Sequence, residues 1–296
     1  MITPCSLRLI DMAISPEAKK LLDRIEEYEK RGLFDKDIND DPPTRPLRAG
    51  EVDYTYKRLS SKFGAYFANK IGSAHFEKMM KNGDVVLKEI RGRENLEAVK
   101  DMGALVTCNH FGVFDNYAVY KALAPTLGKR DLYKVIREGN YTSFPGLYGY
   151  LFRHCNTLPL SSNISCMKEL LAALHVLFER GEKVLIYPEQ GMWMNYRKPR
   201  PLKLGAFRFA AKEAAPIIPI FITLEDTERE DGMGLPVQAY TVHILPPIFP
   251  DKSLSIRENT ERMCLENYRL WKETYESFYG IKLEYTTEGE VSPCST

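Results

Sequence analysis

The chain is constrained most by an alternation of short β-rich runs with helical stretches over its central and C-terminal parts. Short strands separated by helices predict crossover connections, and therefore an α/β fold with a mixed, largely parallel sheet covered by helices. The turn Asp231-Gly232-Met233-Gly234 between the last two runs predicts an antiparallel hairpin at one end of the sheet. The runs are VVLKEI, ALVTCNH, DLYKVIRE, NTLPL, KVLIYPE, PIIPIFITL and VQAYTVHILPP.

Around this region we expect three parts: an N-terminal helical segment over residues 1–82, an α/β domain over 83–285 and a loose tail over 286–296. Ser15 and Pro16 predict the start of a first helix that runs to about residue 31, before Gly32. The acidic and proline-rich stretch 35–50 predicts a linker with little regular structure. Ser255 predicts the cap of a long C-terminal helix that extends to about Tyr279.

Residues 53–82 predict a basic amphipathic helix, because apolar and basic side chains both recur at helical spacing. Such a helix commonly covers its own domain with the apolar face, and we expect that arrangement ahead of a face turned to a membrane surface, although different turns can do both. The apolar positions are Leu59, Phe63, Tyr66, Phe67, Ile71, Phe76, Met79 and Met80, and the basic ones are Lys57, Arg58, Lys62, Lys70, Lys78 and Lys81.

The composition indicates an ordinary globular protein, with 44% hydrophobic residues, 27% charged residues and a formal net charge of +1. We therefore expect no nucleic-acid partner. The six cysteines are scattered without a C-x-x-C pair, which argues against a zinc site or a disulfide framework and favours a reducing, cytoplasmic compartment. No apolar run approaches the ~18 residues of a membrane span, so a lipid substrate would be met by a protein bound peripherally to the membrane.

The string TCNHFGVFDNY, residues 107–117, directly follows a strand-like run and predicts a catalytic pair. His110 and Asp115 are five positions apart, a rotation of roughly 140° on one helix, so they would not share a helical face. We therefore place His110 in a strand-to-helix turn bent at Gly112, with Asp115 one turn into the helix. A neutral imidazole held by a carboxylate can take a proton from an alcohol that attacks a thioester.

The nucleophile is then expected to be the substrate. The chain has no G-x-S-x-G elbow, and strand alternation makes Cys108 a core residue rather than a covalent catalyst. It also has no Walker loop, H-E-x-x-H motif or dinucleotide fingerprint, so we expect neither a metal site nor a cofactor.

With Asn109, His110 and Asp115 as an N-H-x4-D motif, the chain resembles the 1-acylglycerol-3-phosphate O-acyltransferase family of the glycerolipid acyltransferase superfamily. Tyr187-Pro188-Glu189-Gln190-Gly191-Met192 is similar to the family's third motif, F-P-E-G-T-R, and Ala215-Pro216-Ile217-Ile218-Pro219-Ile220 to its fourth, an apolar run with prolines. The resemblance extends over about residues 85–250.

The resemblance implies that His110 is the general base, that Asp115 orients it, and that Glu189, Asn109 and nearby basic residues hold a phosphorylated acceptor. Two departures bear on that acceptor. Gln190 and Met192 replace the family's glycine and arginine. The second motif, which normally ends in an acidic-basic pair, reads Leu158-Pro159-Leu160-Ser161-Ser162 here. The phosphate is therefore expected to be bound differently or to be absent.

Substitute cations cluster in the loops that should gather beyond the carboxyl ends of the strands. Guanidinium and ammonium groups there would favour an anionic partner, although a solvated or membrane-facing basic loop has the same composition. The expected substrate-binding cations are Arg153, Arg197, Lys198, Arg200 and Lys203, with Arg137 and Arg208 close by.

The leading hypothesis is acyl transfer from acyl-CoA or acyl-carrier protein, as a co-substrate, to a hydroxyl of a lysophospholipid such as a lysophosphatidate-like acceptor. Within the same class, the alternative acceptor is an amino-lipid, a glycolipid or a hydroxyacyl lipid. A non-catalytic lipid-binding relative and a thioesterase, in which the same base activates water, are the competing functions.

Overall fold

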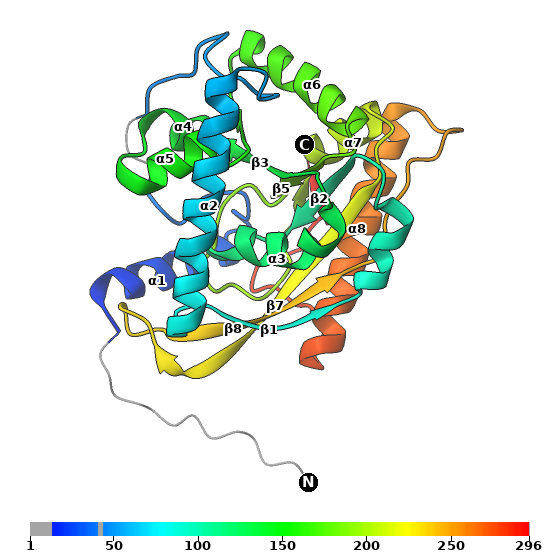
Figure 1. The fold of residues 1–296 in the computed structure, drawn as a ribbon. Helices are drawn as coiled ribbons and strands as arrows, with labels where there is room; N and C mark the ends of the chain where they lie inside the picture. Colours follow the sequence, from blue (N-terminus) through cyan, green and yellow to red (C-terminus); the bar gives the residue numbers. More distant parts are fainter. Residues whose placement is uncertain (1–13, 41–43, 296) are drawn as a thin grey trace.

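The computed structural model describes residues 14–40 and 44–295 and contains the predicted α/β sheet (Figure 1). Its seven strands lie in the order β1-β8-β7-β2-β5-β3-β4. The five strands from β7 to β4 are parallel; β8 runs antiparallel to β7, and β1 is parallel to β8. The strands are β1 Val86–Arg91, β2 Ala104–Cys108, β3 Leu132–Arg137, β4 Thr157–Leu160, β5 Lys183–Ile186, β7 Ile217–Glu230 and β8 Pro236–Ile244.

Helices cover both faces of this sheet, as predicted. On one face α3 (Asp115–Leu127) and the 3-10 helix η1 (Arg93–Val99) pack on the apolar side chains of β2, β7 and β8. On the other face lie α6 (Ile164–Glu179), α7 (Leu204–Lys212) and α8 (Ile256–Tyr279). Strand β2 is buried on both sides because it is the central strand of the seven and helices cover both faces of the sheet, which explains its mostly apolar sequence.

The predicted caps and turns are confirmed. Ser15 Oγ accepts the Ala18 N–H at 3.1 Å, and α1 spans Pro16–Lys30. Ser255 forms a capping box with Glu258 at the start of α8. The turn at residues 231–234 joins β7 and β8 as an antiparallel hairpin. The described parts of the stretch 35–50 contain no helix or strand.

Helix α2 (Leu59–Asn82) begins six residues later than predicted, and its orientation differs from the expected one. Its small residues Ala65, Ala68 and Gly72 are the buried ones. A Cβ atom on Gly72 would lie 3.6 Å from Leu151 of α5 (Gly146–His154), so small side chains allow α2 to pack closely on α5. The expectation that the large apolar side chains of α2 cover the core is therefore wrong for its first half.

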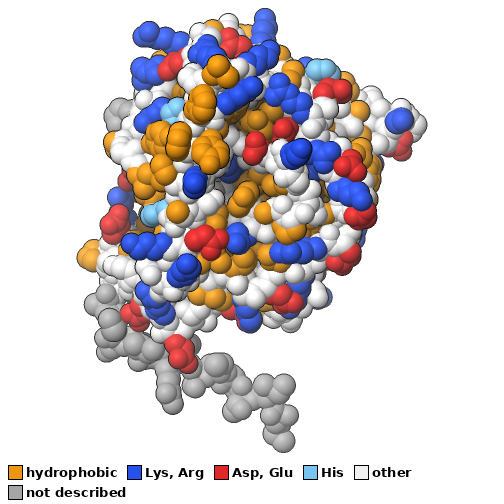
Figure 2. Space-filling model, in the orientation of Figure 1, with side chains coloured by type: hydrophobic (Ala, Val, Ile, Leu, Met, Phe, Trp, Pro, Cys, Tyr) orange, Lys and Arg blue, Asp and Glu red, His pale blue; other side chains and the backbone are white. Residues whose placement is uncertain are grey.

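Those large side chains point outward. Their exposed fractions are 70% for Leu59, 64% for Phe63, 60% for Tyr66, 53% for Phe67 and 42% for Ile71. Figure 2 shows apolar side chains gathered over α2 and the neighbouring α4 (Glu138–Ser143) and α5, with lysine and arginine around them. In its second half α2 does contact the core, where Phe76 stacks on Tyr117 of α3 at 4.6 Å between ring centroids.

The C-terminal residues are held in place, contrary to the prediction of a loose tail. Cys264 of α8 and Cys294 form a disulfide, so the expectation that the cysteines stay unpaired is wrong for this pair. Next to it, β9 (Cys294–Ser295) pairs with β6 (Leu202–Lys203). The scattered spacing of the cysteines gave no signal, because the pairing depends on how the tail folds back on α8.

Candidate active site

The predicted catalytic pair lies at the carboxyl end of β2, in the turn that leads into α3. Cys108 ends the strand and is fully buried, and desolvation raises its thiol pKa well above the usual range, in agreement with a core role. Asn109 is also buried; its amide donates to Ile222 O at 3.0 Å and accepts from Ile222 N at 2.8 Å. Asn109 therefore fastens the turn to β7, and its side chain faces the protein rather than an open cleft.

His110 and Asp115 form the expected contact, with Nδ1 of the imidazole 2.7 Å from Oδ2 of the carboxylate. Helix α3 begins at Asp115 itself rather than one turn earlier. The side chain of Asp115 is fully buried and also accepts the backbone N–H groups of Phe111 and Gly112 at 3.3 and 3.4 Å. A carboxylate at a helix N-terminus is favoured by the helix dipole. Asp115 thus holds one nitrogen of the imidazole. The histidine side chain is 22% exposed, so part of the ring stays accessible.

Tyr187 is a third member of this site that the sequence interpretation missed. Its ring stacks on the His110 imidazole, with centroids 4.0 Å apart and planes 17° apart. Its hydroxyl donates to Asp115 Oδ1 at 2.6 Å. Burial, together with the Asp115 charge, raises the pKa of Tyr187 well above its usual range, so the phenol remains a donor at working pH. The available signal was its position in the third motif, where the family usually has phenylalanine.

Glu189 and Arg200 form a buried ion pair beneath the candidate catalytic turn, residues 109–114 between β2 and α3. Glu189 Oε2 is 2.8 Å from the Arg200 guanidinium and accepts the His110 backbone N–H at 3.0 Å. Arg200 also donates to the carbonyl oxygens of His110, Gly191 and Phe34. Both side chains are at least 98% buried. In this structure they therefore position the backbone of His110, and their charged groups are directed at the chain itself.

The loop that follows Glu189 is tied directly to the catalytic turn. Trp193 donates its backbone N–H to His110 O at 3.1 Å, and Asn195 donates to Phe111 O at 3.0 Å. Trp193 is fully buried in a small apolar cluster with Ile25, Phe34 and Ile38 of the N-terminal segment. Packing, rather than a membrane interface, accounts for this tryptophan.

The remaining predicted substrate-binding cations already contact acceptors from the chain. Arg153 donates to Phe144 O at 3.2 Å, whereas Arg208 is exposed on α7. Four of the basic residues form ion pairs: Arg197 with Asp226 at 2.6 Å, Lys198 with Glu29 at 2.6 Å, Lys203 with Asp35 at 3.2 Å and Arg137 with Asp37 at 2.9 Å. Each of these four basic residues thus has a carboxylate beside it.

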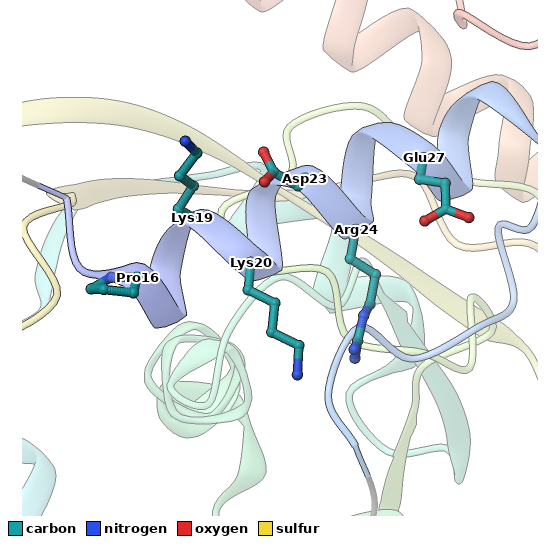
Figure 3. Close-up of a pocket in the computed structure, with 6 residues that line it drawn as sticks. All are labelled: Pro16, Lys19, Lys20, Asp23, Arg24 and Glu27. Carbon is teal, nitrogen blue, oxygen red and sulfur yellow. The ribbon is translucent and has the colours of Figure 1, made fainter.

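Two shallow surface hollows lie on other parts of the molecule. One, of about 380 Å³, is lined by a single face of α1, including Lys19, Asp23 and Arg24 (Figure 3). The other lies between α2 and α3 and is lined in part by Glu77 and Lys121. Neither is lined by His110 or Asp115.

Across residues 14–40 and 44–295, no three histidine, cysteine or acidic side chains are arranged to hold a metal ion. Among the helices of that same part of the chain, none is long and apolar enough to cross a bilayer.

Comparisons with known proteins bear on the family and the fold. Residues 88–223 match the family model named Acyltransferase, a range that contains His110, Asp115, Tyr187 and Glu189. Among solved structures, the chain is similar to a 1-acyl-sn-glycerophosphate acyltransferase, PlsC, from Thermotoga maritima, with a TM-score of 0.51 and 18% identity. That similarity covers 78% of this chain and 87% of the other, and it shows a shared fold. A search of curated proteins finds no match.

Proposed function

We propose that this chain, whose residues 88–223 match the Acyltransferase family model, moves a fatty acyl group from acyl-CoA or acyl-carrier protein to a hydroxyl of a lipid acceptor. The observation that carries the proposal is the 2.7 Å contact between His110 Nδ1 and the buried Asp115 carboxylate, on an imidazole that remains partly exposed.

The proposed reaction is direct transfer in a ternary complex. With Nδ1–H donated to Asp115, the other ring nitrogen of His110 removes the proton of the acceptor hydroxyl as its oxygen attacks the thioester carbonyl. The tetrahedral intermediate then expels the thiolate, which receives the proton from the imidazolium. One O-acyl bond forms and one C–S bond breaks, and Asp115 stabilises the transient positive charge. No metal or cofactor takes part in this scheme; a backbone amide of the turn or of a helix N-terminus is proposed to stabilise the oxyanion.

Two classes of acceptor fit this reaction, a lysophospholipid and a phosphate-free lipid. Resemblance to the lysophosphatidate acyltransferases favours a lysophospholipid. The specific observation that favours a phosphate-free acceptor, such as an amino-lipid or glycolipid, is the pairing of Lys198, Lys203 and Arg137 with carboxylates of the chain.

We further propose that the protein works at a membrane surface through the outward face of α2. Exposed Phe63, Tyr66 and Phe67 lie beside exposed Lys62 and Lys70, which is the combination that favours the interfacial region of an anionic bilayer. A lipid acceptor would then be reached without leaving its membrane.

The test of the function is mass-spectrometric detection of acylated product from each donor with a panel of lipid acceptors. Wild type is compared with His110→Ala and Asp115→Asn. An asparagine amide would donate to Nδ1 and leave the other nitrogen protonated, so we expect a loss of about 10³-fold or more in kcat for Asp115→Asn. Product that forms equally in wild type and His110→Ala would contradict the proposal, and free fatty acid in place of acylated acceptor would indicate a thioesterase.

A further inference from the structure

A short N-terminal segment, from Glu29 to Asp37, supplies the carboxylates that neutralise the predicted phosphate-binding cations. The three cations come from separate places in the chain: the loop after β5, strand β6 and the end of β3. The pairs are Lys198 with Glu29, Lys203 with Asp35 and Arg137 with Asp37. Within these three pairs, three positive and three negative charges cancel.

The same segment lies directly on the loop of the third motif. Lys36 O accepts the indole N–H of Trp193 at 2.7 Å, and a Cβ atom on Gly191 would come within 2.5 Å of that carbonyl. The Met192 backbone N–H points at Asp37 Oδ2 from 3.5 Å, and the Arg137 guanidinium approaches the same oxygen to 2.9 Å. A guanidinium and a backbone amide that converge on one oxygen make an anion-binding arrangement. Here a carboxylate of the chain itself occupies it.

A phosphate monoester brought to these cations would meet the resident carboxylates as well. Glu29 and Asp37 are only 8% and 17% exposed, so solvent screens their charges incompletely. Displacing them from their cations would leave partly buried carboxylates without their counter-charges, which is unfavourable. The segment therefore acts against a phosphorylated head group and does not affect an uncharged one.

We propose that the acceptor is a phosphate-free lipid alcohol, with Asp35 and Asp37 excluding the phosphate monoester of lysophosphatidate. This inference rests on the proposed acyl transfer and specifies its acceptor class. It agrees with the third motif, where Met192 stands in place of the family's arginine.

The experiment compares two acceptors that differ only in phosphate: a monoacylglycerol and the lysophosphatidate with the same acyl chain. The readout is the ratio of their kcat/KM values, measured with wild type and with Asp35→Asn/Asp37→Asn. The control, Asp23→Asn/Glu26→Gln, makes the same change in net charge at exposed positions of α1. Circular dichroism and thermal unfolding check that each variant is folded, and Asp35→Asn alone, at a 40% exposed side chain, replaces the double variant if that fails to fold.

For wild type we expect the ratio of kcat/KM values to favour monoacylglycerol by about tenfold or more. In the aspartate variant this ratio should shift at least about tenfold toward lysophosphatidate, because part of the like-charge repulsion is removed. The control should keep the wild-type ratio. Equal or preferential use of lysophosphatidate by wild type would overturn this inference and leave acyl transfer standing. An unchanged ratio in the aspartate variant, or the same shift in the control, would also overturn it. A protein that acylates no lipid alcohol of either class would overturn the proposed function and this inference together.

Discussion

The phenol oxygen of Tyr187 lies 2.6 Å from Oδ1 of Asp115, so the carboxylate that holds His110, the proposed general base, is itself held on its other oxygen. A buried carboxylate needs partners for both oxygens, because an unsatisfied charged group in the interior is costly. Tyr187 supplies the second partner and also covers one face of the imidazole. It is thus a positioning residue that acts through Asp115 and His110.

Tyr187→Phe keeps the stacked ring and removes only this hydrogen bond. We expect kcat/KM to fall about tenfold, in line with the loss of one hydrogen bond to a charged group. The loss should appear in kcat with KM little changed, because this hydrogen bond positions the proposed base and does not touch the substrate. A rise in KM at unchanged kcat would contradict this role.

The α2 surface leads to a prediction about membranes. Phe63→Ser/Phe67→Ser should weaken co-sedimentation with anionic liposomes, because two large exposed apolar side chains no longer enter the interface. Charge reversal of Lys57, Arg58 and Lys62 should also weaken liposome binding, and this loss should be larger at low salt than at high salt. Leu265→Ser, at a half-exposed position of α8, is the matched control. Binding that is unchanged in all variants would remove α2 from the membrane proposal.

The buried ion pair beneath the catalytic turn leads to a prediction about stability. Arg200→Met should lower the free energy of unfolding by about 3 kcal/mol, because Glu189 would remain buried without its cation. Urea unfolding measures this effect. The exposed pair of Arg257 and Glu261 on α8 provides the comparison: Arg257→Met should change stability by less than about 0.5 kcal/mol. Similar effects of the two substitutions would contradict the assignment.

His243 leads to a prediction about pH. Burial, with a smaller contribution from Arg91, lowers its pKa to about 4, and its ring contacts the Thr223 hydroxyl at 3.0 Å. Between about pH 6.5 and pH 4 the unfolded chain binds a proton at this histidine and the folded chain does not, so stability falls as the pH falls through that window. His243→Gln should lose less stability than wild type between pH 7 and pH 4.5, by up to roughly 3 kcal/mol. Parallel pH curves for the two proteins in urea unfolding would rule this out.

Much of the fold follows from short-range patterns. The β-rich runs, the capping serines at positions 15 and 255 and the hairpin turn at 231–234 each act over a few residues, and all appear in the structure. The same holds for His110 and Asp115, since a strand end, a bend and a helix start within six residues leave few ways to arrange them. The orientation of helix α2 was harder to predict from the sequence, because a mixed apolar and basic helix has two faces that can pack, and its neighbours in the fold select one of them. Its small residues, which allow close approach to α5, decided that choice.

The sequence by itself therefore determined the fold class, because local backbone preference and hydrophobic periodicity encode it, and its acyltransferase motifs indicated the candidate catalytic pair. Tertiary structure alone decided what surrounds the pair. Tyr187 reaches Asp115 across 72 positions of sequence, and Arg200 is directed at the catalytic turn instead of a substrate. It also decided that the acids at positions 29, 35 and 37 lie on the basic loops. Charge partners are chosen by distance in space, and the packing of the N-terminal segment on the domain sets that distance.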